Sequence, residues 1–399
     1  MLEYSTLAVS ANPLDLPGQL VRTIKVVHMT SAHPALDGRI FQKECRSLAR
    51  AGFDVTIVCP HSEDTVADCV HIKSVPRGTS RISRMTRTAW RVYRKAKKLE
   101  ADIYHFHDHE LIPAGLLLRA SGKEVIYDIH EDVPKDVYSK HYLPSWSKPS
   151  VAWLLDRLEI LVAKRFSALV TVTPSIAERF RSLNDRTIIV HNFPYQKEIV
   201  GAGERVPWAT RRQAIAYVGL ISANRGIREM VFAMSFLPRV VPATLELAGN
   251  EKPVNVRAEE LASHPGWARV HHHGVLDQQS TFRLLHGVRA GLVLFHPEAN
   301  HIEAMPMKIF EYMGAGLPVI ASDFPLWRRI LGDTGCGIFV NPQDPRGIAK
   351  AIEYILTHPK EAEEMGRRGQ AAVMERYNWE TQADKLVTLY LGLAKPCAA

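Results

Sequence analysis

The sequence predicts an α/β protein in which two doubly wound, Rossmann-like domains face each other across a cleft. Three observations predict this fold. Short β-branched runs alternate with amphipathic helical patterns along the chain. The strand-like runs are apolar nearly throughout, as in parallel strands that helices cover on both faces. The alternation stops at a polar, irregular stretch near the middle and then restarts, so the repeated element is a whole domain.

The first half contains six strand-like runs with helical patterns between them. These runs are residues 23–29, 54–59, 103–106, 125–128, 168–172 and 187–190. The clearest helical pattern covers residues 38–50, where Ile40, Phe41 and Leu48 lie along one helix. This order of strands and helices favours a parallel sheet.

The second half repeats the pattern. Its expected strands are residues 214–218, 244–248, 269–273, 291–295, 318–321 and 337–340. A long helical region, 346–377, precedes a last helix near 379–393 that we expect to cross back to the first domain. The predicted organisation is a leader (1–22), a first domain (23–195), a linker (196–213), a second domain (214–378), and a C-terminal crossing helix with its tail (379–399).

The composition is that of an ordinary globular protein. Hydrophobic residues make up 46% and charged residues 23% of the 399 residues, which excludes a disordered chain, a collagen and a coiled coil. No apolar run reaches the length of a membrane-spanning helix, and the first residues do not resemble a secretory signal. The five cysteines include no C-x-x-C pair, so we expect neither a disulfide framework nor a zinc site, and we expect a cytoplasmic protein.

The most informative stretch runs from residue 303 to residue 322. Glu303 and Glu311 are separated by seven residues, and Pro306 is suited to the first turn of a helix that begins between them. A helix N-terminus is a favourable seat for a diphosphate because its N–H groups are unpaired. A carboxylate can accept hydrogen bonds from two neighbouring hydroxyls. The pattern therefore predicts a phosphate seat between two hydroxyl-binding carboxylates.

This stretch, EAMPMKIFEYMGAGLPVIAS, resembles the signature of the family 4 glycosyltransferases with the GT-B fold. The resemblance extends over nearly the whole chain. It implies a bacterial-type, retaining transferase that uses a nucleotide-sugar donor. It also implies that Glu303 contacts the donor sugar and Glu311 the nucleotide ribose, with Ala304, Met305 and Ile309 beside them.

A second donor element is the segment YVGLISANRG, residues 217–226. It looks like the family's strand–loop–helix segment in which an Arg and a Lys stabilise the leaving diphosphate. Here Leu220 stands where the family usually has the Arg, and Arg225 replaces the Lys. We expect Lys308 to supply the missing positive charge, and Gly219 to lie beside the ligand. A guanidinium can bind two phosphate oxygens at once, so Arg225 suits this role.

Two further segments resemble landmarks of the nucleotide site. Gly249 ends a strand in a turn where backbone can approach the nucleotide, and His273 and Gly274 stand near the nucleobase. A metal reading of the neighbouring histidines is not favoured, because adjacent residues of a strand point to opposite faces. We therefore expect no metal ion and no cofactor beyond the nucleotide-sugar substrate, which is most often UDP-linked in this family.

The acceptor side is expected in the first domain. Gly38 and Arg39 follow the loop after the first strand, and Asp37 can cap the next helix. Polar clusters follow two other strands where a site is expected. The acceptor-side residues they supply are His107, Asp108 and Glu131. His130 matches a histidine that faces the donor sugar in relatives.

The resemblance implies transfer in which the departing phosphate oxygen accepts the proton of the acceptor. Arg225 and Lys308 would stabilise the leaving group, and Glu303 and His130 would orient the sugar. Two alternatives stay open at this point. One is a sugar-nucleotide 2-epimerase of similar fold, and the other is an inactive protein that binds a sugar nucleotide.

The expected acceptor is a glycan, a lipid-linked sugar or a small molecule. The net charge is +8, and residues 77–98 hold nine basic side chains and no acid. That segment predicts a helix with a basic face, opposite an apolar stripe that includes Ile82, Met85 and Val92. With the aromatic residues Tyr138, Tyr142 and others up to Trp153, it predicts peripheral association with an anionic membrane on its cytoplasmic face. No nucleic-acid-binding motif is present, so nucleic acid is not an expected partner.

Overall fold

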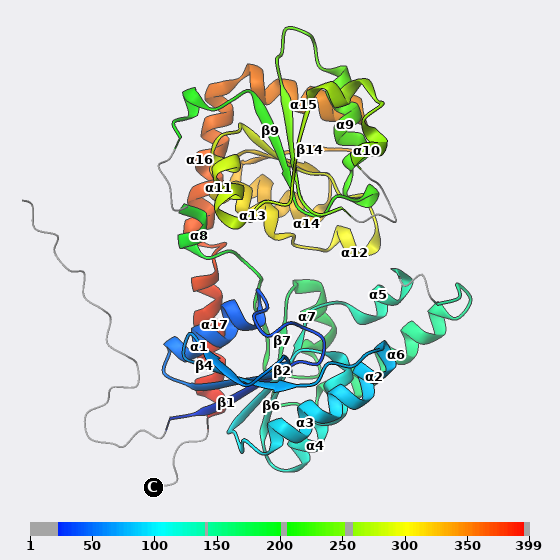
Figure 1. Cartoon of the computed structure of the whole chain (residues 1–399), viewed down its shortest axis with the longest axis vertical. Helices are drawn as coiled ribbons and strands as arrows, with labels where there is room; N and C mark the ends of the chain where they lie inside the picture. Colours follow the sequence, from blue (N-terminus) through cyan, green and yellow to red (C-terminus); the bar gives the residue numbers. More distant parts are fainter. Residues whose placement is uncertain (1–22, 140–142, 201–205, 252–257, 395–399) are drawn as a thin grey trace, which may run out of the picture. The chain divides into compact units, whose positions relative to one another are not determined.

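The computed structural model describes residues 23–139, 143–200, 206–251 and 258–394 (Figure 1). The predicted leader and the last five residues lie outside this part of the chain, as does Tyr142. The chain divides into two compact units. Unit 1 consists of Met1–His191 with Gln382–Ala399, and unit 2 of Asn192–Thr381. The division falls within the last helix, whose C-terminal part belongs with unit 1.

Unit 1 is built on an eight-stranded sheet in the order β3-β4-β2-β1-β5-β6-β7-β8. All its neighbours pair in parallel except β3 and β4. The strands are β1 (Lys25–Met29), β2 (Asp54–Pro60), β3 (Thr65–Ala67), β4 (Val70–Val75), β5 (Ile103–Phe106), β6 (Glu124–Ile129), β7 (Ala168–Thr171) and β8 (Thr187–Ile189). The hairpin of β3 and β4 was not predicted. It turns at Asp68 and Cys69, which both have positive φ without being glycine, and such turns carry a weak sequence signal.

Helices fill the connections of unit 1. They are η1 (Ile40–Cys45), α1 (Arg46–Arg50), α2 (Arg81–Ser83), η2 (Arg84–Thr88), α3 (Ala89–Lys97), η3 (His109–Leu111), α4 (Ile112–Ala120), α5 (Val133–Ser139), α6 (Lys148–Ala163) and α7 (Pro174–Arg181). The predicted helix over 38–50 is present as η1 followed by α1. The predicted basic helix is present as α2, η2 and α3 in direct succession.

The two faces of this sheet differ in chemistry. On one face, Val27, Tyr104 and Tyr127 join an apolar cluster with residues of α3, α4 and α7. Because side chains alternate along a strand, their neighbours His28, His105 and Asp128 lie on the opposite face. The parallel register pairs His28 of β1 with His105 of β5, so these two imidazoles are side by side. One face of unit 1 is therefore an apolar core, and the other buries a cluster of titratable groups.

Unit 2 has a six-stranded parallel sheet in the order β11-β10-β9-β12-β13-β14. The strands are β9 (Ala214–Val218), β10 (Thr244–Ala248), β11 (Val270–Gly274), β12 (Ala290–Val293), β13 (Val319–Ser322) and β14 (Gly337–Val340). All six agree with the predicted strands to within two residues. With the sheet of unit 1, this confirms the predicted fold of two Rossmann-like domains.

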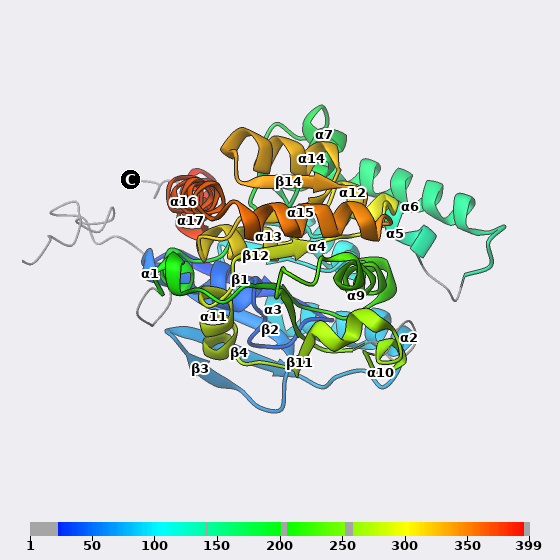
Figure 2. The ribbon, with the colours of Figure 1, turned by 90° about the horizontal axis from the view of Figure 1, so that it is seen from above.

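The helices of unit 2 cover both faces of its sheet. They are α8 (Gln196–Val200), η4 (Trp208–Thr210), η5 (Ala223–Arg225), α9 (Ile227–Phe236), α10 (Ala258–Leu261), η6 (Pro265–Arg269), α11 (Gln278–His286), α12 (Ala299–Ile302), α13 (Met307–Gly314), α14 (Pro325–Trp327), η7 (Arg328–Gly332), α15 (Pro345–Thr357) and α16 (Pro359–Glu375). Figure 2 shows α9 beside α15, and the two helices pack together in one apolar core. The C-terminal helix is α17 (Trp379–Leu393).

Two segments of unit 2 differ from the prediction. The long helical region is two helices that break at His358, which precedes a proline and so leaves the helical conformation. The segment predicted as a linker contains α8 and η4, and Trp208 of η4 is buried in the core of unit 2.

Candidate functional site

Lys308 is the most buried charged residue among those predicted to bind the donor. It lies in the first turn of α13 and is buried, 6% exposed. Its ammonium group lies 4.0 Å from the centroid of the Tyr217 ring and 5.4 Å from that of Phe295. Cation–π attraction of this kind stabilises a desolvated ammonium. Two aromatic rings from β9 and the end of β12 thus hold Lys308 in place.

The ammonium of Lys308 has no hydrogen-bond partner among the described residues. Burial lowers the pKa of Lys308 to about 7, with a further lowering by the charge of Arg225 and an opposing effect of Glu311. A buried donor without a partner is costly unless a ligand satisfies it. Lys308 is therefore suited to an anionic group of a ligand.

Arg225 completes the positive part of the site. Its guanidinium lies 4.9 Å from the centroid of the Phe295 ring. It directly precedes Gly226, which has a φ of 75° and starts α9. A Cβ at Gly226 would lie 2.2 Å from the carbonyl oxygen of Leu294, so only glycine fits this turn. The turn holds Arg225 close to the Phe295 ring that also contacts Lys308.

Leu220 lies at the position where the family usually has an arginine. It is half-buried, and its carbonyl oxygen accepts a hydrogen bond of 2.6 Å from the Tyr217 hydroxyl. Burial raises the pKa of Tyr217 to about 12, against an opposing effect of Arg225. The hydroxyl therefore stays protonated and fixes the loop, while Lys308 and Arg225 carry the positive charge.

The loop before α13 is held from two sides. Glu303 caps the C-terminus of α12, a short helix that was not predicted. The Ala304 N–H donates to the carbonyl of His301, and the Trp327 Nε1–H donates to the Ala304 carbonyl at 2.8 Å. Ala304 is therefore committed to internal partners and its N–H is not available for a phosphate.

Pro306 stands at the N-cap of α13, one position before the predicted first turn. Its ψ of 132° is extended, and no side chain caps this helix end. The adjacent Met305 is half-buried against the apolar core. Glu311 lies in the second turn, as predicted, and is half-buried near Lys308. Ile309 is fully buried and donates its N–H to the Pro306 carbonyl, so it supports the helix start from inside.

Three glycines close the backbone around the ends of β9, β10 and β11. Gly219, Gly249 and Gly274 have φ values of 137°, 146° and 65°. A Cβ at Gly249 would lie 1.7 Å from the Gly219 carbonyl oxygen, and one at Gly219 would lie 2.7 Å from Lys308 Nζ. The Gly249 N–H donates to the Gly274 carbonyl at 2.7 Å. The three turns therefore pack directly on one another and on Lys308.

His273 is tied to a buried carboxylate. Its Nε2 lies 2.7 Å from Oε2 of Glu246, while His271 Nδ1 lies 3.1 Å and Arg212 Nη1 2.8 Å from Oε1. His272 points elsewhere, with its Nε2 3.6 Å from Glu251. This is the alternation predicted for the strand. Glu246 orients His273 at the end of β11, a contact that sequence reasoning missed.

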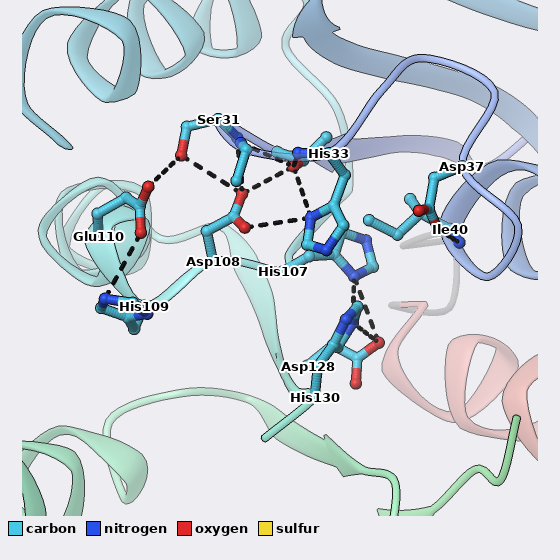
Figure 3. Close-up of polar contacts among 12 residues, drawn as sticks. Ser31, His33, Asp37, Ile40, His107, Asp108, His109, Glu110, Asp128 and His130 are labelled. Atoms are coloured by element: carbon cyan, nitrogen blue, oxygen red, sulfur yellow. Dashed lines mark hydrogen bonds and ion pairs between the residues drawn. The ribbon is translucent and has the colours of Figure 1, made fainter. Parts of the chain in front are cut away.

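Asp108 organises the site of unit 1 (Figure 3). Its Oδ2 accepts hydrogen bonds of 2.7 Å from the Thr30 hydroxyl and from the Ser31 N–H. Its Oδ1 lies 3.2 Å from His33 Nδ1. Burial opposes the ionised form, but these partners hold the pKa of Asp108 well below its usual range. Conversely, although burial lowers it, the hydrogen bond and charge of Asp108 raise the pKa of His33.

A chain of imidazoles lies next to Asp108. His107 Nδ1 lies 3.2 Å from His130 Nε2, and both rings contact Oδ2 of Asp128, at 3.3 and 3.0 Å. Burial lowers the pKa of His107 to about 4. His107 is therefore neutral near pH 7. Figure 3 shows His33 and His130 meeting at this cluster, with their ring centroids 5.4 Å apart.

Arg39 is turned inward. It donates to the Val190 carbonyl at 3.0 Å and to Asp128 at 3.3 Å, and it is 7% exposed. Asp37 caps the start of η1 by accepting the N–H groups of Arg39 and Ile40. Gly38 has open space around it, and Glu131 is exposed. Arg39 thus supports the cluster, whereas Gly38 and Glu131 can be reached by a ligand.

Sequence reasoning missed several members of the unit 1 site. They are His28, His33, Glu44, His105, Glu110 and Tyr390. Glu110 accepts the Ser31 hydroxyl at 2.9 Å and pairs with Arg84 of η2 at 2.9 Å. The signal for His105 was present, because His105 and His107 are two residues apart and so share a face of β5. Two groups of these side chains could hold a metal ion, namely His28, Glu44, His105 and His107, and His107, Asp128 and His130.

Two family profiles match the chain. One, described as Glycosyltransferase Family 4, matches residues 38–193, and the other, described as Glycosyl transferases group 1, matches residues 202–372. Among curated proteins, the glycogen synthase of Mycobacterium tuberculosis strain H37Rv is 22% identical over 303 residues, covering 73% of this chain and 69% of the relative. The MMP alpha-(1->4)-mannosyltransferase of Mycolicibacterium hassiacum is 23% identical, covering 71% and 69%.

Solved structures show the same fold. The sucrose-phosphate synthase of Thermosynechococcus elongatus matches with a TM-score of 0.71 at 18% identity, covering 93% of this chain and 99% of that one. The Anabaena protein HepE, solved in complex with UDP, matches with a TM-score of 0.67 at 12% identity, covering 93% and 100%. At these identities the likeness establishes the architecture of the two domains.

Proposed function

The chain belongs to the family 4 glycosyltransferases and has their GT-B fold, and we propose that it transfers a sugar from a UDP-linked donor to a glycan or lipid-linked acceptor with retention of anomeric configuration. The observation that carries the donor assignment is the buried ammonium of Lys308 beneath the Gly219 turn, which has no hydrogen-bond partner among the described residues. The HepE structure contains bound UDP, which supports UDP as the first candidate for the nucleotide part of the donor.

The donor diphosphate would bind at the N-terminus of α13, between Lys308 and Arg225. Both cations are held by the Phe295 ring, so they are oriented before the ligand arrives. Glu311 in the second turn would accept the ribose hydroxyls, and Glu303 the hydroxyls of the sugar. Lys308 becomes satisfied only when the phosphate binds, which favours the bound state.

In the transfer step, the bond between the anomeric carbon and the diphosphate oxygen breaks as the acceptor oxygen bonds to that carbon on the same face. The departing phosphate oxygen takes the acceptor proton. Negative charge grows on the diphosphate, and the preorganised charges of Lys308 and Arg225 stabilise it without a metal ion in the donor site. His130 and Asp108 of unit 1 would orient the sugar and the acceptor.

We further propose that unit 1 binds an anionic membrane. The basic segment exposes Arg87, Arg91 and Arg94, and its first turns also expose Ile82 and Met85. Of the predicted apolar stripe, only the later residues, such as Val92, are buried. Exposed cations beside exposed apolar side chains suit the interface of an anionic bilayer.

Helix α6 supports this proposal because it exposes several large apolar side chains. Its inward face carries Glu159, which accepts the Tyr127 hydroxyl at 3.1 Å and pairs with Arg179. Its exposed apolar side chains are Trp153, Leu154, Leu158 and Leu161. No helix among the described residues is long and apolar enough to cross a membrane. An apolar outer face on α6 is therefore suited to lie in the interface, on the cytoplasmic side where nucleotide sugars are available.

The donor assignment is tested by a thermal-shift panel of UDP, GDP and ADP with their glucose and mannose derivatives, since a ligand that binds only the folded state raises Tm. Slow hydrolysis of the preferred donor without acceptor then reports the stereochemistry by NMR. We expect release of the anomer with the donor's configuration. Inversion would contradict the mechanism. Binding without any turnover would indicate an inactive protein, and epimerised donor would indicate an epimerase.

A further inference from the structure

Four buried side chains converge on the polar face of the unit 1 sheet. His28 comes from β1, Glu44 from η1, and His105 and His107 from β5 and the residue just after it. One nitrogen or oxygen atom of each lies within 4.8 Å of those of the other three. All four are at most 4% exposed. Three imidazoles and a carboxylate at this spacing are a donor set that first-row transition metals prefer.

The outer nitrogen of each imidazole already has a partner. The Tyr390 hydroxyl of α17 lies 2.6 Å from His105 Nδ1 and 3.2 Å from His28 Nε2. Asp128 Oδ2 lies 3.3 Å from His107 Nδ1. In metal sites, a ligating histidine almost always uses its second nitrogen in this way, which fixes the ring.

The ring nitrogens and carboxylate oxygens that face one another inside the cluster, called the inner atoms here, have fewer partners. His28 Nδ1 and His107 Nε2 contact only each other among the described residues, at 2.9 Å. His105 Nε2 and both oxygens of Glu44 make no hydrogen bond within the described part of the chain. Arg39 Nε lies 3.0 Å from Glu44 Oε1 as an ion pair, and Asp128 Oδ2 lies 3.8 Å from His105 Nε2. Among these inner atoms, His105 Nε2 and Glu44 Oε2 are thus left without a close polar partner in the described part of the chain, which is costly for buried groups without a ligand.

We propose that unit 1 holds a divalent transition metal ion of the zinc class, with His28, His105, His107 and Glu44 as its ligands. Bonds of about 2.0–2.1 Å in a tetrahedral site place ligand atoms about 3.3 Å apart. The observed spacing therefore needs only small side-chain movements. Four protein ligands and full burial are typical of a structural site rather than a catalytic one. All four ligands belong to unit 1, and the proposal does not depend on the proposed transfer.

The proposed ligands also connect to the acceptor-side residues of unit 1. Because His107 also contacts Asp128 and His130, the ion would fix the acceptor-side cluster.

The test uses full-length protein stripped of metal with a chelator. We expect one equivalent of Zn²⁺ to bind and raise Tm, and one equivalent of Co²⁺ to give the intense visible absorption of a tetrahedral site. The His28→Gln/Glu44→Gln variant should lose both signals. The variant His61→Gln/His71→Gln changes two exposed histidines of unit 1, and as the matched control it should retain them. Wild-type protein without the tetrahedral Co²⁺ spectrum, or a spectrum lost only in the control variant, would overturn the proposal.

The Tyr390→Phe variant tests whether the Tyr390 hydroxyl orients the metal ligands or whether Tyr390 only packs against them. It keeps the ring and removes the hydroxyl that orients His28 and His105. Loss of an outer-shell partner should weaken Zn²⁺ binding by about 10- to 100-fold. Unchanged Zn²⁺ affinity in Tyr390→Phe would overturn the assignment of His28 and His105 as ligands, because both rings would have lost the hydroxyl that orients them.

Discussion

The ammonium group of Lys308 lies 4.0 Å from the centre of the Tyr217 ring, directly beneath Gly219, where an added Cβ would come within 2.7 Å of it. Two features therefore require glycine at position 219. A side chain there would collide with Lys308, and the backbone φ of 137° is one that other residues rarely adopt. This relationship links the two donor segments, one after β9 and the other in α13. It also makes Lys308 the residue on which the donor site can be tested most directly.

Lys308→Met should separate stability from function. The folded pKa of about 7 lies below the usual value of 10.5, so the unfolded chain binds more protons between these values. The lysine therefore costs stability in the ligand-free protein, most at low pH, and its replacement by an apolar side chain should raise Tm. UDP affinity should fall by roughly ten- to a hundred-fold, the effect of losing a charged hydrogen bond. Calorimetric titration with UDP and thermal unfolding measure the two effects.

The pH dependence sharpens this prediction. Wild-type affinity for UDP should fall as the pH rises above about 7, by up to ~10-fold per unit, because only the charged ammonium binds phosphate. Lys308→Met should show only the pH dependence of UDP itself. Lys197, an exposed lysine 5.1 Å from the Tyr195 ring, provides the control, and Lys197→Met should behave as wild type. Equal pH profiles for Lys308→Met and wild type would remove Lys308 from the donor site.

Removal of the Glu311 carboxylate and removal of the Glu303 carboxylate should affect different steps. Glu311→Ala should weaken binding of UDP alone by about 10- to 100-fold, because a charged hydrogen-bonding group contributes ~1.5–3 kcal/mol. Glu303→Ala should leave UDP affinity unchanged and reduce sugar transfer, because Glu303 is assigned to the sugar. Calorimetry with UDP and a transfer assay distinguish the two. Unchanged UDP affinity in Glu311→Ala would refute the ribose assignment.

Gly249→Ala tests the packing of the turns. The new Cβ would lie 1.7 Å from the Gly219 carbonyl, and backbone cannot yield as a flexible side chain would. We expect a loss of stability at or above the ~3 kcal/mol upper range of overpacking, with loss of UDP binding. Gly392→Ala in α17 is the control, because nothing lies within 4 Å of its added Cβ. It should stabilise by roughly 0.5–1 kcal/mol through helix propensity. Near-wild-type melting of Gly249→Ala would contradict this account.

The parallel strands could be predicted because each is a short apolar run between helical patterns. The β3–β4 hairpin was missed since its turn uses Asp68 and Cys69 with positive φ, and η1 was missed as a distinct helical form within 38–50. The break at His358 follows from the proline after it, a signal that was present in the sequence. Local patterns thus predicted element types, and the β3–β4 hairpin was missed because its turn contains no glycine.

For the candidate site, residues next to each other in sequence were easier to find than residues brought together by the sheet. Glu311 and Lys308 share one helix, and their spacing could be interpreted directly. The histidine cluster joins β1, β5 and the C-terminal helix through Tyr390, which is 285 residues from His105. Contacts of that range depend on strand order and register, and a single sequence specifies neither.

Membrane binding can be tested with variants that change the basic surface and the apolar surface of unit 1 separately. Liposomes containing anionic lipid should bind the protein at low salt, and added salt should weaken binding. Each exposed basic residue near the surface should contribute about 1 kcal/mol. A basic variant changes four residues to Ser, namely Arg87, Arg91, Arg94 and Lys98, and should lose most of the binding. A control with the same charge change in unit 2 replaces Arg239, Arg329, Lys350 and Lys360, all exposed, and should bind as wild type.

An apolar variant changes Leu154, Leu158 and Leu161 to Ser. It should weaken the part of the binding that persists at high salt, because insertion of α6 does not depend on charge. Co-sedimentation measures all three, and equal losses in the basic variant and the unit 2 control would show that binding reflects net charge rather than these surfaces.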